Sequence, residues 1–199
     1  MAILITGGAR SGKSRFAEQY AARLAAHGMY VATCQAFDNE MDDRISKHKH
    51  DREASGFIWE TKEEPLEAAA VLQAYGEGIR AKLLAEPTQK PPVVLLDCLT
   101  LWLTNWMFYY ENDNHAEQKL AAKARELVLA IQQYPYPLLI VTNEVGDGIV
   151  PVNALARAFR DEAGRLNQAV AAVCDKVFLV TAGIPVDVKA LAFRWEELT

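Results

Sequence analysis

The feature that most constrains this chain is a glycine-rich loop close to its N-terminus. The apolar run at residues 2–6 leads into Gly-Gly-Ala-Arg-Ser-Gly-Lys-Ser at residues 7–14, which matches the phosphate-binding pattern G-x-x-x-x-G-K-[ST]. Its glycines let backbone N–H groups wrap a phosphate, and the positive end of the following helix points at the same charge. We expect a nucleoside triphosphate here, with these phosphate contacts: Gly7, Gly8, Ala9, Arg10, Ser11, Gly12, Lys13 and Ser14.

Composition limits the class of protein. The chain has 199 residues, of which 51% are hydrophobic, so we expect a single P-loop α/β domain spanning residues 1–199. A net charge of −5 argues against nucleic acid as a partner. No apolar run approaches the ~20 residues of a membrane span, and the run at 2–6 is a predicted core strand rather than a signal peptide. We therefore expect a cytoplasmic protein in which Cys34, Cys98 and Cys174 are reduced thiols.

Apolar runs alternate with helical patterns along the chain. The runs are nearly continuous in Val, Ile and Leu, which is typical of strands buried on both faces. The predicted strands are Ala2–Thr6, Met29–Thr33, Val93–Asp97, Leu138–Thr142 and Val177–Thr181. Helices are predicted after the glycine-rich loop, over Glu64–Ala85, over Ala116–Gln133, and from about Leu155 to Val173. This alternation predicts an α/β fold, a P-loop NTPase-like open, mostly parallel sheet with helices on both faces.

The residues that follow the predicted strands are candidates for a site, because ligands of such sheets bind at the carboxyl ends of the strands. Asp97 closes an apolar strand, where P-loop folds keep a Mg²⁺-linked carboxylate, so we expect Ser14 and Asp97 to bind Mg²⁺. Thr33 and Asn143 also end strands. Each of these two is as well explained as an ordinary strand terminator.

A basic segment at residues 41–52 is the second unusual feature. In a helix, Arg44, His48 and Arg52 share one face, and His50 points nearly opposite. Two guanidiniums beside an imidazole favour its neutral form, which is the form that attacks phosphorus. In an extended segment His48 and His50 would share a face instead. Spacing alone favours a third interpretation, a solvated charge-rich helix.

Five motifs in order resemble one enzyme family. They are the loop at 7–14, Arg-Ile-x-x-His-x-x-x-Arg at 44–52, Trp-x-Thr-x-Glu at 59–63, Asn-Glu-Val-Gly at 143–146 through Pro151, and Ala-Arg-x-Phe-Arg-Asp-x-x-Gly-x-x-Asn-Gln at 156–168. Together they resemble the bifunctional adenosylcobinamide kinase / adenosylcobinamide-phosphate guanylyltransferase of cobalamin biosynthesis. The resemblance covers residues 1 to about 183.

The resemblance implies two reactions. A nucleoside triphosphate, ATP or GTP, phosphorylates adenosylcobinamide, and GMP from GTP then passes through a guanylyl-histidine to adenosylcobinamide phosphate. It places the GMP on His48, gives Lys13 a catalytic role, and suggests a homotrimer. The guanine-nucleotide contacts that it implies are Thr33, Cys34, Gln35, Lys49, His50, Asp51, Arg52 and Glu63.

Several of these residues have ordinary explanations. Glu63 can accept hydrogen bonds from guanine N1–H and its amine, yet it also suits the start of a helix before Pro65. Trp102 and Trp106 fit core or interface packing better than a corrin platform. Polar residues of the last helix face either the corrinoid phosphate or a subunit interface. These residues are Arg157, Arg160, Asp161 and Asn167.

Two other functions stay open on the sequence alone. A single-activity P-loop kinase for a small metabolite would transfer phosphoryl groups without a covalent nucleotide. A non-catalytic nucleotide-binding switch would do neither, although it would not need the His/Arg cluster at 44–52.

Overall fold

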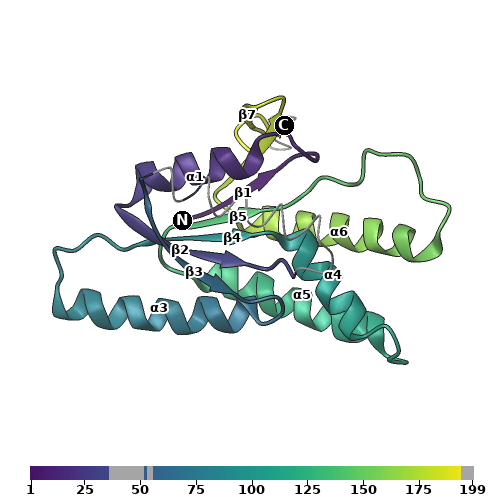
Figure 1. Cartoon of the computed structure of the whole chain (residues 1–199), viewed down its shortest axis with the longest axis horizontal. Coiled ribbons are helices and arrows are strands. Elements are labelled where there is room, and N and C mark those ends of the chain that lie inside the picture. Colours follow the sequence, from purple (N-terminus) through teal and green to yellow (C-terminus); the bar gives the residue numbers. More distant parts are fainter. Residues whose placement is uncertain (36–51, 53–55, 194–199) are drawn as a thin grey trace, which may run out of the picture.

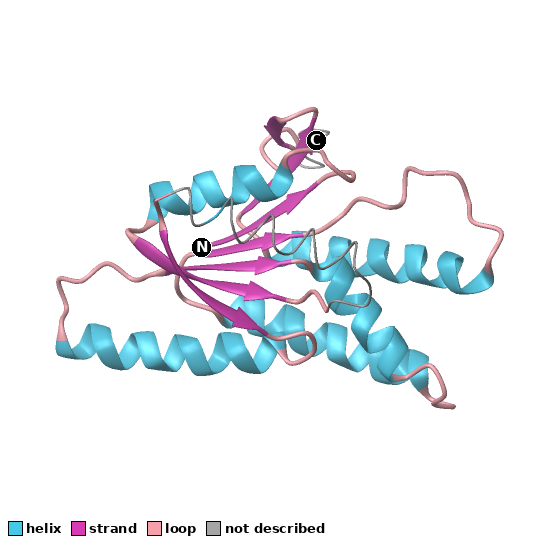
Figure 2. Ribbon diagram, in the orientation of Figure 1, coloured by secondary structure: helices cyan, strands magenta, loops and turns pink. Residues whose placement is uncertain are grey.

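A seven-stranded, mostly parallel sheet forms the centre of the described chain (Figures 1 and 2). The structure is a computed structural model that describes residues 1–35, 52 and 56–193. The strand order is β3-β2-β4-β5-β1-β6-β7, and β7 pairs antiparallel to β6 while the other pairs are parallel. The strands are β1 (Ala2–Thr6), β2 (His27–Ala32), β3 (Ile58–Glu63), β4 (Val93–Asp97), β5 (Leu138–Val141), β6 (Lys176–Thr181) and β7 (Ile184–Asp187).

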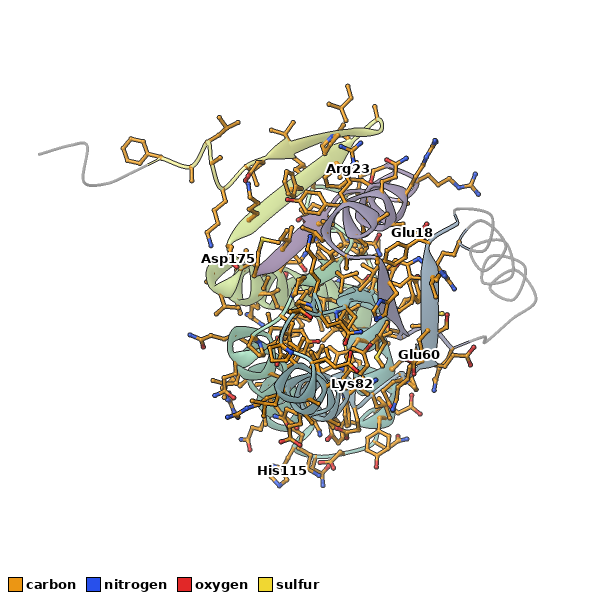
Figure 3. All side chains as sticks on the ribbon, turned by 90° about the vertical axis from the view of Figure 1, so that its left-hand side faces the viewer. Glu18, Arg23, Glu60, Lys82, His115 and Asp175 are labelled. Atoms are coloured by element: carbon orange, nitrogen blue, oxygen red, sulfur yellow. The ribbon has the colours of Figure 1, made fainter. Side chains whose placement is uncertain are left out.

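Helices cover both faces of this sheet, which confirms the predicted fold class. Helix α1 (Lys13–Leu24) packs on one face. On the other face pack α3 (Ala68–Ala85), α4 (Leu99–Tyr109), α5 (Ala116–Gln133) and α6 (Ala154–Val173). Figure 3 shows the two layers from the side, with Arg23 of α1 and Lys82 of α3 on opposite sides of the sheet.

The alternation of side chains along the strands divides the core in two. In β1, Ile3 and Ile5 belong to the cluster with Ala17 of α1, whereas Leu4 belongs to the cluster with Leu127 of α5. All five side chains are buried. Because both faces of the central strands are covered, their sequences are continuously apolar. The five predicted strands are confirmed, with ends shifted by at most two residues.

Two strands were missed by the sequence analysis, β3 and β7. Both lie at the edges of the sheet, where most of their side chains are exposed. Edge strands have no continuous apolar run, so their sequences lack the signal that identifies the central strands. Accordingly Glu63 ends a strand, and its interpretation as a helix-starting acid was wrong.

Helix α3 begins four residues later than predicted, at Ala68 rather than Glu64. The residues before it form a turn, in which the Glu64 carboxylate accepts hydrogen bonds from the backbone N–H groups of Leu66 and Glu67 at 3.2 and 2.9 Å. A side chain that bonds its own backbone in this way favours a turn over a helix interior.

The two tryptophans of α4 lie in the core, as the preferred interpretation predicted. Trp102 and Trp106 are buried, and both indole N–H groups donate to the carbonyl of Leu66, at 2.7 and 3.0 Å. This shared acceptor fixes the turn before α3 against α4. Neither ring forms an exposed platform.

The predictions about the cysteines and about membrane spans can be compared with the described residues. All three cysteines lie in the described part and are free thiols, Cys34 half-buried and the other two buried. Within residues 1–35 and 56–193, no helix has both the length and the apolar character that a membrane crossing requires.

Candidate nucleotide-binding and active site

The glycine-rich loop joins β1 to α1 at the carboxyl edge of the sheet. A Cβ at Gly7 would lie 2.4 Å from the carbonyl oxygen of Val180, so the close approach of β6 excludes any larger residue. Gly12 has φ of +95°, a left-handed conformation that side chains rarely adopt. The loop backbone therefore needs glycine at these two positions.

Helix α1 begins directly at the end of the loop. Its N-cap is Gly12, which offers no side-chain acceptor to the N–H groups of the first turn. Those N–H groups and the positive end of the helix are suited to bind an anion. Lys13 is only 7% exposed, and its Nζ donates to the carbonyl of Gly8 at 3.2 Å, which folds the ammonium back over the loop.

Two backbone hydrogen bonds hold the loop from both sides. The N–H of Gly183, in the turn between β6 and β7, donates to the carbonyl of Ser11 at 2.8 Å. On the other side the N–H of Glu144, after β5, donates to the carbonyl of Gly7 at 3.1 Å. The loop is thus braced between the ends of neighbouring strands, and its shape does not depend on a ligand alone.

Asp97 lies at the end of β4 on the face that α1 covers. It follows Val93 and Leu95 in alternation, and both of these pack in the cluster that contains α1. One carboxylate oxygen, Oδ2, accepts a hydrogen bond from the Tyr30 hydroxyl at 2.9 Å. Within the described residues this is the one hydrogen bond of the Asp97 carboxylate.

Tyr30 lies between Asp97 and a basic side chain. Its ring is 5% exposed, and the guanidinium carbon of Arg52, itself 5% exposed, sits 3.7 Å from the ring centroid. Trp59 contacts the same ring edge-on, with centroids 5.9 Å apart. Burial, followed by the negative charge of Asp97, raises the pKa of Tyr30 well above its ordinary value, so the phenol stays protonated and donates.

Thr33 joins the ends of β2 and β4. Its hydroxyl donates to the carbonyl of Cys98 at 2.7 Å and accepts from the N–H of Cys98 at 2.8 Å, and Asn105 of α4 donates to the Thr33 carbonyl at 2.8 Å. Thr33 is fully buried, so in this structure its side chain connects strand ends. Burial raises the pKa of Cys98 to about 11, and this thiol is therefore not a nucleophile near neutral pH.

Cys34, Gln35 and Glu63 come together at the ends of β2 and β3. The register pairs Ala32 with Glu63, and the N–H of Glu64 donates to the carbonyl of Ala32 at 2.8 Å. Burial and then the charge of Asp97 raise the pKa of Cys34. The charges of Asp97 and Glu63 both act on the Cys34 thiol, which therefore lies near both carboxylates.

A second polar network ties the end of β5 to two helices. Thr142 donates to Asn167 of α6 at 2.7 Å, and Asn143 donates to the hydroxyl of Thr100 of α4 at 2.6 Å. Asn167 also donates to the carbonyl of Asn143 at 3.2 Å. Asn167 therefore faces the strand ends, an orientation toward the sheet that the sequence analysis did not predict.

The arginines at the start of α6 bind the loop that precedes this helix. Arg157 donates to the carbonyls of Pro151 and Val152, and Arg160 donates to the carbonyl of Gly146. Asp161, the residue after Arg160, lines a cavity between α4, α5 and α6. Loop bracing accounts for the two arginines without a phosphate.

Four predicted residues lie outside the described part of the chain: His48, Lys49, His50 and Asp51. Arg52 is described, and its place over Tyr30 was not foreseen. The sequence analysis also missed Tyr30, which appeared only as part of an apolar strand. A tyrosine two residues before the end of a strand that neighbours an acid-ended strand is the signal that could have found it.

Ser14 and Asp97 offer the kind of ligands that Mg²⁺ prefers. One is a hydroxyl in the first turn of α1 and the other a carboxylate at the end of β4, and both are hard oxygen donors. Among the described residues, no group of three His, Cys, Asp or Glu side chains forms a separate metal cluster. The residues present therefore fit a nucleotide-bound Mg²⁺ rather than a caged ion.

A braced glycine-rich loop, a helix N-terminus with a lysine over it, and a carboxylate at a neighbouring strand end define a P-loop NTPase-like nucleotide-binding protein. A family model described as cobinamide kinase / cobinamide phosphate guanyltransferase matches residues 3–188. The chain belongs to this family, and it is an enzyme with both of the family's activities.

Three curated relatives are each named as a bifunctional adenosylcobalamin biosynthesis protein. The bifunctional adenosylcobalamin biosynthesis protein CobP of Pseudomonas aeruginosa is 41% identical over 189 residues, covering 95% of this chain and 98% of the relative. The bifunctional adenosylcobalamin biosynthesis proteins CobU of Escherichia coli and Salmonella typhimurium are 42% and 43% identical over 197 residues, covering 95% of this chain and 100% of each relative. The chain is therefore similar to them over nearly its whole length.

Proposed function

We propose that this chain phosphorylates adenosylcobinamide and then converts the product to adenosylcobinamide-GDP, in one domain that spans residues 1–199. The observation that carries the proposal is the braced phosphate loop with Lys13 folded over it, in a chain that matches the family from residue 3 to 188. A single-activity kinase or a nucleotide switch would leave the two-activity family match unexplained.

In the first reaction the aminopropanol hydroxyl of adenosylcobinamide attacks the γ-phosphorus of ATP or GTP, and the nucleoside diphosphate leaves. The loop N–H groups and the N-terminus of α1 hold the β- and γ-phosphates, while Lys13 and Arg10 neutralise their charge. Ser14 and Asp97 would hold Mg²⁺, which when bound would neutralise further charge on the phosphates. The protein's part is positioning and electrostatic stabilisation.

In the second reaction a histidine becomes the acceptor. The imidazole of His48 attacks the α-phosphorus of GTP, a P–N bond forms, and pyrophosphate leaves. A phosphate oxygen of adenosylcobinamide phosphate then attacks the same phosphorus, and the imidazole leaves with its electron pair. Arg44 and Arg52, four residues to either side in the sequence, would hold phosphate charge against it.

Selection of guanine is assigned to the ends of β2 and β3. Glu63 closes β3 beside Ala32, the residue before Thr33, Cys34 and Gln35. A carboxylate there can accept hydrogen bonds from guanine N1–H and from the exocyclic amine. Adenine does not present these two donors side by side. The proposed nucleotide contacts in the basic segment are Lys49, His50, Asp51 and Arg52.

The assembly that we propose is a homotrimer, as the family resemblance suggests. Sedimentation equilibrium at micromolar concentration tests it directly. A species of three times the 22.1 kDa chain mass is expected, and a monomer would overturn the proposal.

The deciding experiment is incubation with Mg²⁺ and α-³²P-labelled GTP without a corrinoid, followed by denaturation and counting of protein-bound label. We expect label that is lost in acid and kept in alkali, because a histidine phosphoramidate has that stability. His48→Ala should carry none, and the control variant His115→Ala, at an exposed histidine before α5, should carry the wild-type amount. Label on His48→Ala but not on His50→Ala would move the assignment to His50, and no label on the wild type would remove the guanylyl-histidine.

A further inference from the structure

The hydrogen bond between Tyr30 and Asp97 stands out because it connects a buried core residue to the carboxylate that the proposed function gives to Mg²⁺. Tyr30 lies on β2 and Asp97 on β4, and the register places Ala32 beside Asp97. Tyr30 precedes Ala32 by two residues, so its side chain lies on the same face of the sheet as that of Asp97 but further from the carboxyl edge. The side chain runs along the sheet, and its hydroxyl reaches Oδ2 of Asp97 at 2.9 Å.

The Tyr30 side chain has little freedom to move away from this position. Arg52 covers one side of the ring at 3.7 Å, Trp59 meets it edge-on at 5.9 Å, and only 5% of the residue is exposed. A cation over an aromatic face is stabilising, most of all when desolvated. The hydroxyl is thus a fixed donor to Asp97.

A donor fixed on one carboxylate oxygen selects a single orientation of the carboxylate. Without it, rotation about the Cα–Cβ and Cβ–Cγ bonds would let Asp97 adopt several positions, and ordering it would cost free energy whenever metal binds. Groups that orient a ligand in this way commonly raise metal affinity by about 10–100-fold.

We propose that Tyr30 is a positioning residue for the metal of the bound nucleotide: its hydroxyl holds Oδ2 of Asp97 and so presents the carboxylate to Mg²⁺ in a pre-ordered state. The inference rests on the proposed role of Asp97. It adds to that role a residue that contacts neither the nucleotide nor the metal. It also explains why the Tyr30 hydroxyl lies among the polar groups at the strand ends.

The test is metal binding measured apart from turnover. Mn²⁺ is titrated into the full-length protein with a non-hydrolysable GTP analogue, and free Mn²⁺ is followed by its electron paramagnetic resonance signal. Tyr30→Phe removes one oxygen atom and should weaken Mn²⁺ binding about 10-fold, while the affinity for the analogue without metal stays at the wild-type value.

The matched control is Tyr134→Phe. Tyr134 is 6% exposed, its hydroxyl has no hydrogen-bond partner in the described structure, and it packs on the other face of the sheet. Mn²⁺ affinity should be unchanged in this variant. Circular dichroism of both variants confirms that they are folded before the titration.

Asp97→Asn separates failure of this inference from failure of the proposed function. If Asp97→Asn binds Mn²⁺ as tightly as the wild type, Asp97 is not a metal ligand and the proposed function loses that assignment. If Asp97→Asn binds weakly while Tyr30→Phe binds normally, only the positioning role is overturned. If the inference is right, Tyr30→Phe has no further effect in the Asp97→Asn background, because the two residues act as a unit.

Discussion

The two faces of the sheet carry different kinds of residues. On one face, α1 packs against Ile3, Ile5 and their neighbours, and that layer also holds Lys13, Tyr30 and Asp97. On the other face, four helices enclose a larger cluster made almost wholly of apolar side chains. The buried charged side chains of the described residues, Lys13 and Arg52, both belong to the α1 layer, whereas the buried polar side chains of α4 in the four-helix layer, Thr100 and Asn105, are uncharged.

This difference teaches how one sheet serves two purposes. Apolar burial stabilises by about 25 cal/mol per Å² and needs no orientation, so a thick apolar layer provides stability. Charged groups can stay buried only when they are paired or hydrogen-bonded, as Lys13 is to Gly8 and Asp97 to Tyr30. The α1 layer meets this requirement, and its charged groups are the ones proposed to act in the reactions.

Removing the lysine of the α1 layer should have the largest effect on activity. Lys13→Ala takes away a cation aimed at the phosphates, and we expect both reactions to slow by about 10²–10³-fold. The free energy of unfolding should change little by comparison. Lys82→Ala, an exposed lysine on α3, is the control for a general charge effect. The steady-state rates of both reactions and the affinity for GTP measure the effect of Lys13→Ala. Unchanged GTP affinity in this variant would contradict the phosphate role of Lys13.

Creating a cavity in the four-helix layer should have the opposite result, lowering stability more than activity. Leu127 is fully buried in α5, so Leu127→Ala should lower the free energy of unfolding by about 3 kcal/mol through lost burial and a cavity. On the same helix Leu129 is 52% exposed, and Leu129→Ala should cost no more than about 0.5 kcal/mol. Urea unfolding gives both values. A kcat of the folded Leu127→Ala protein that fell as far as that of Lys13→Ala would break the comparison between the faces.

The smallest expected effect concerns alkaline pH. Burial, with smaller contributions from Tyr75 and Tyr136, raises the pKa of Tyr134 above its ordinary value of 10.0. The folded protein then holds this proton more tightly than the unfolded chain does, so the associated stability is present below pH 10 and is lost as pH rises.

Comparing unfolding free energies at pH 9 and pH 11 tests this prediction. Tyr134→Phe should lose about 1 kcal/mol less than the wild type over that interval, because the variant has no proton to release there. Equal losses in the two proteins would show that Tyr134 titrates normally, and that the four-helix layer does not exclude hydroxide as its packing suggests.

Much of the fold was predictable because its signals are local. The central strands are buried on both faces, so each is a continuous apolar run, and all five were found. The edge strands β3 and β7 were not, because exposed residues such as Glu60 and Ile184 in their sequences follow no burial pattern. Their place is set by pairing with β2 and β6, which no single segment encodes.

The candidate site, like the fold, was predictable only in part. The loop with Lys13 and Ser14 was predicted because a phosphate requires these residue types in this order, and Asp97 was predicted because it ends an apolar strand. Thr33 and Asn143 were left undecided between ligand contact and strand end, and the structure places both in hydrogen bonds that join neighbouring elements. Spacing cannot separate these roles, since a polar group at a strand end looks the same in either.

By itself, then, the sequence determined that this chain builds a P-loop at the edge of an α/β sheet and carries the motifs of its family, because glycine conformations, apolar runs and a lysine–serine pair act over a few residues. Only the tertiary structure decided that Tyr30 reaches Asp97, that Arg52 covers its ring, and that Asn167 turns toward Thr142. Those contacts join residues 22 to 67 positions apart. Their formation depends on strand register and helix packing, which arise only when the whole sheet assembles.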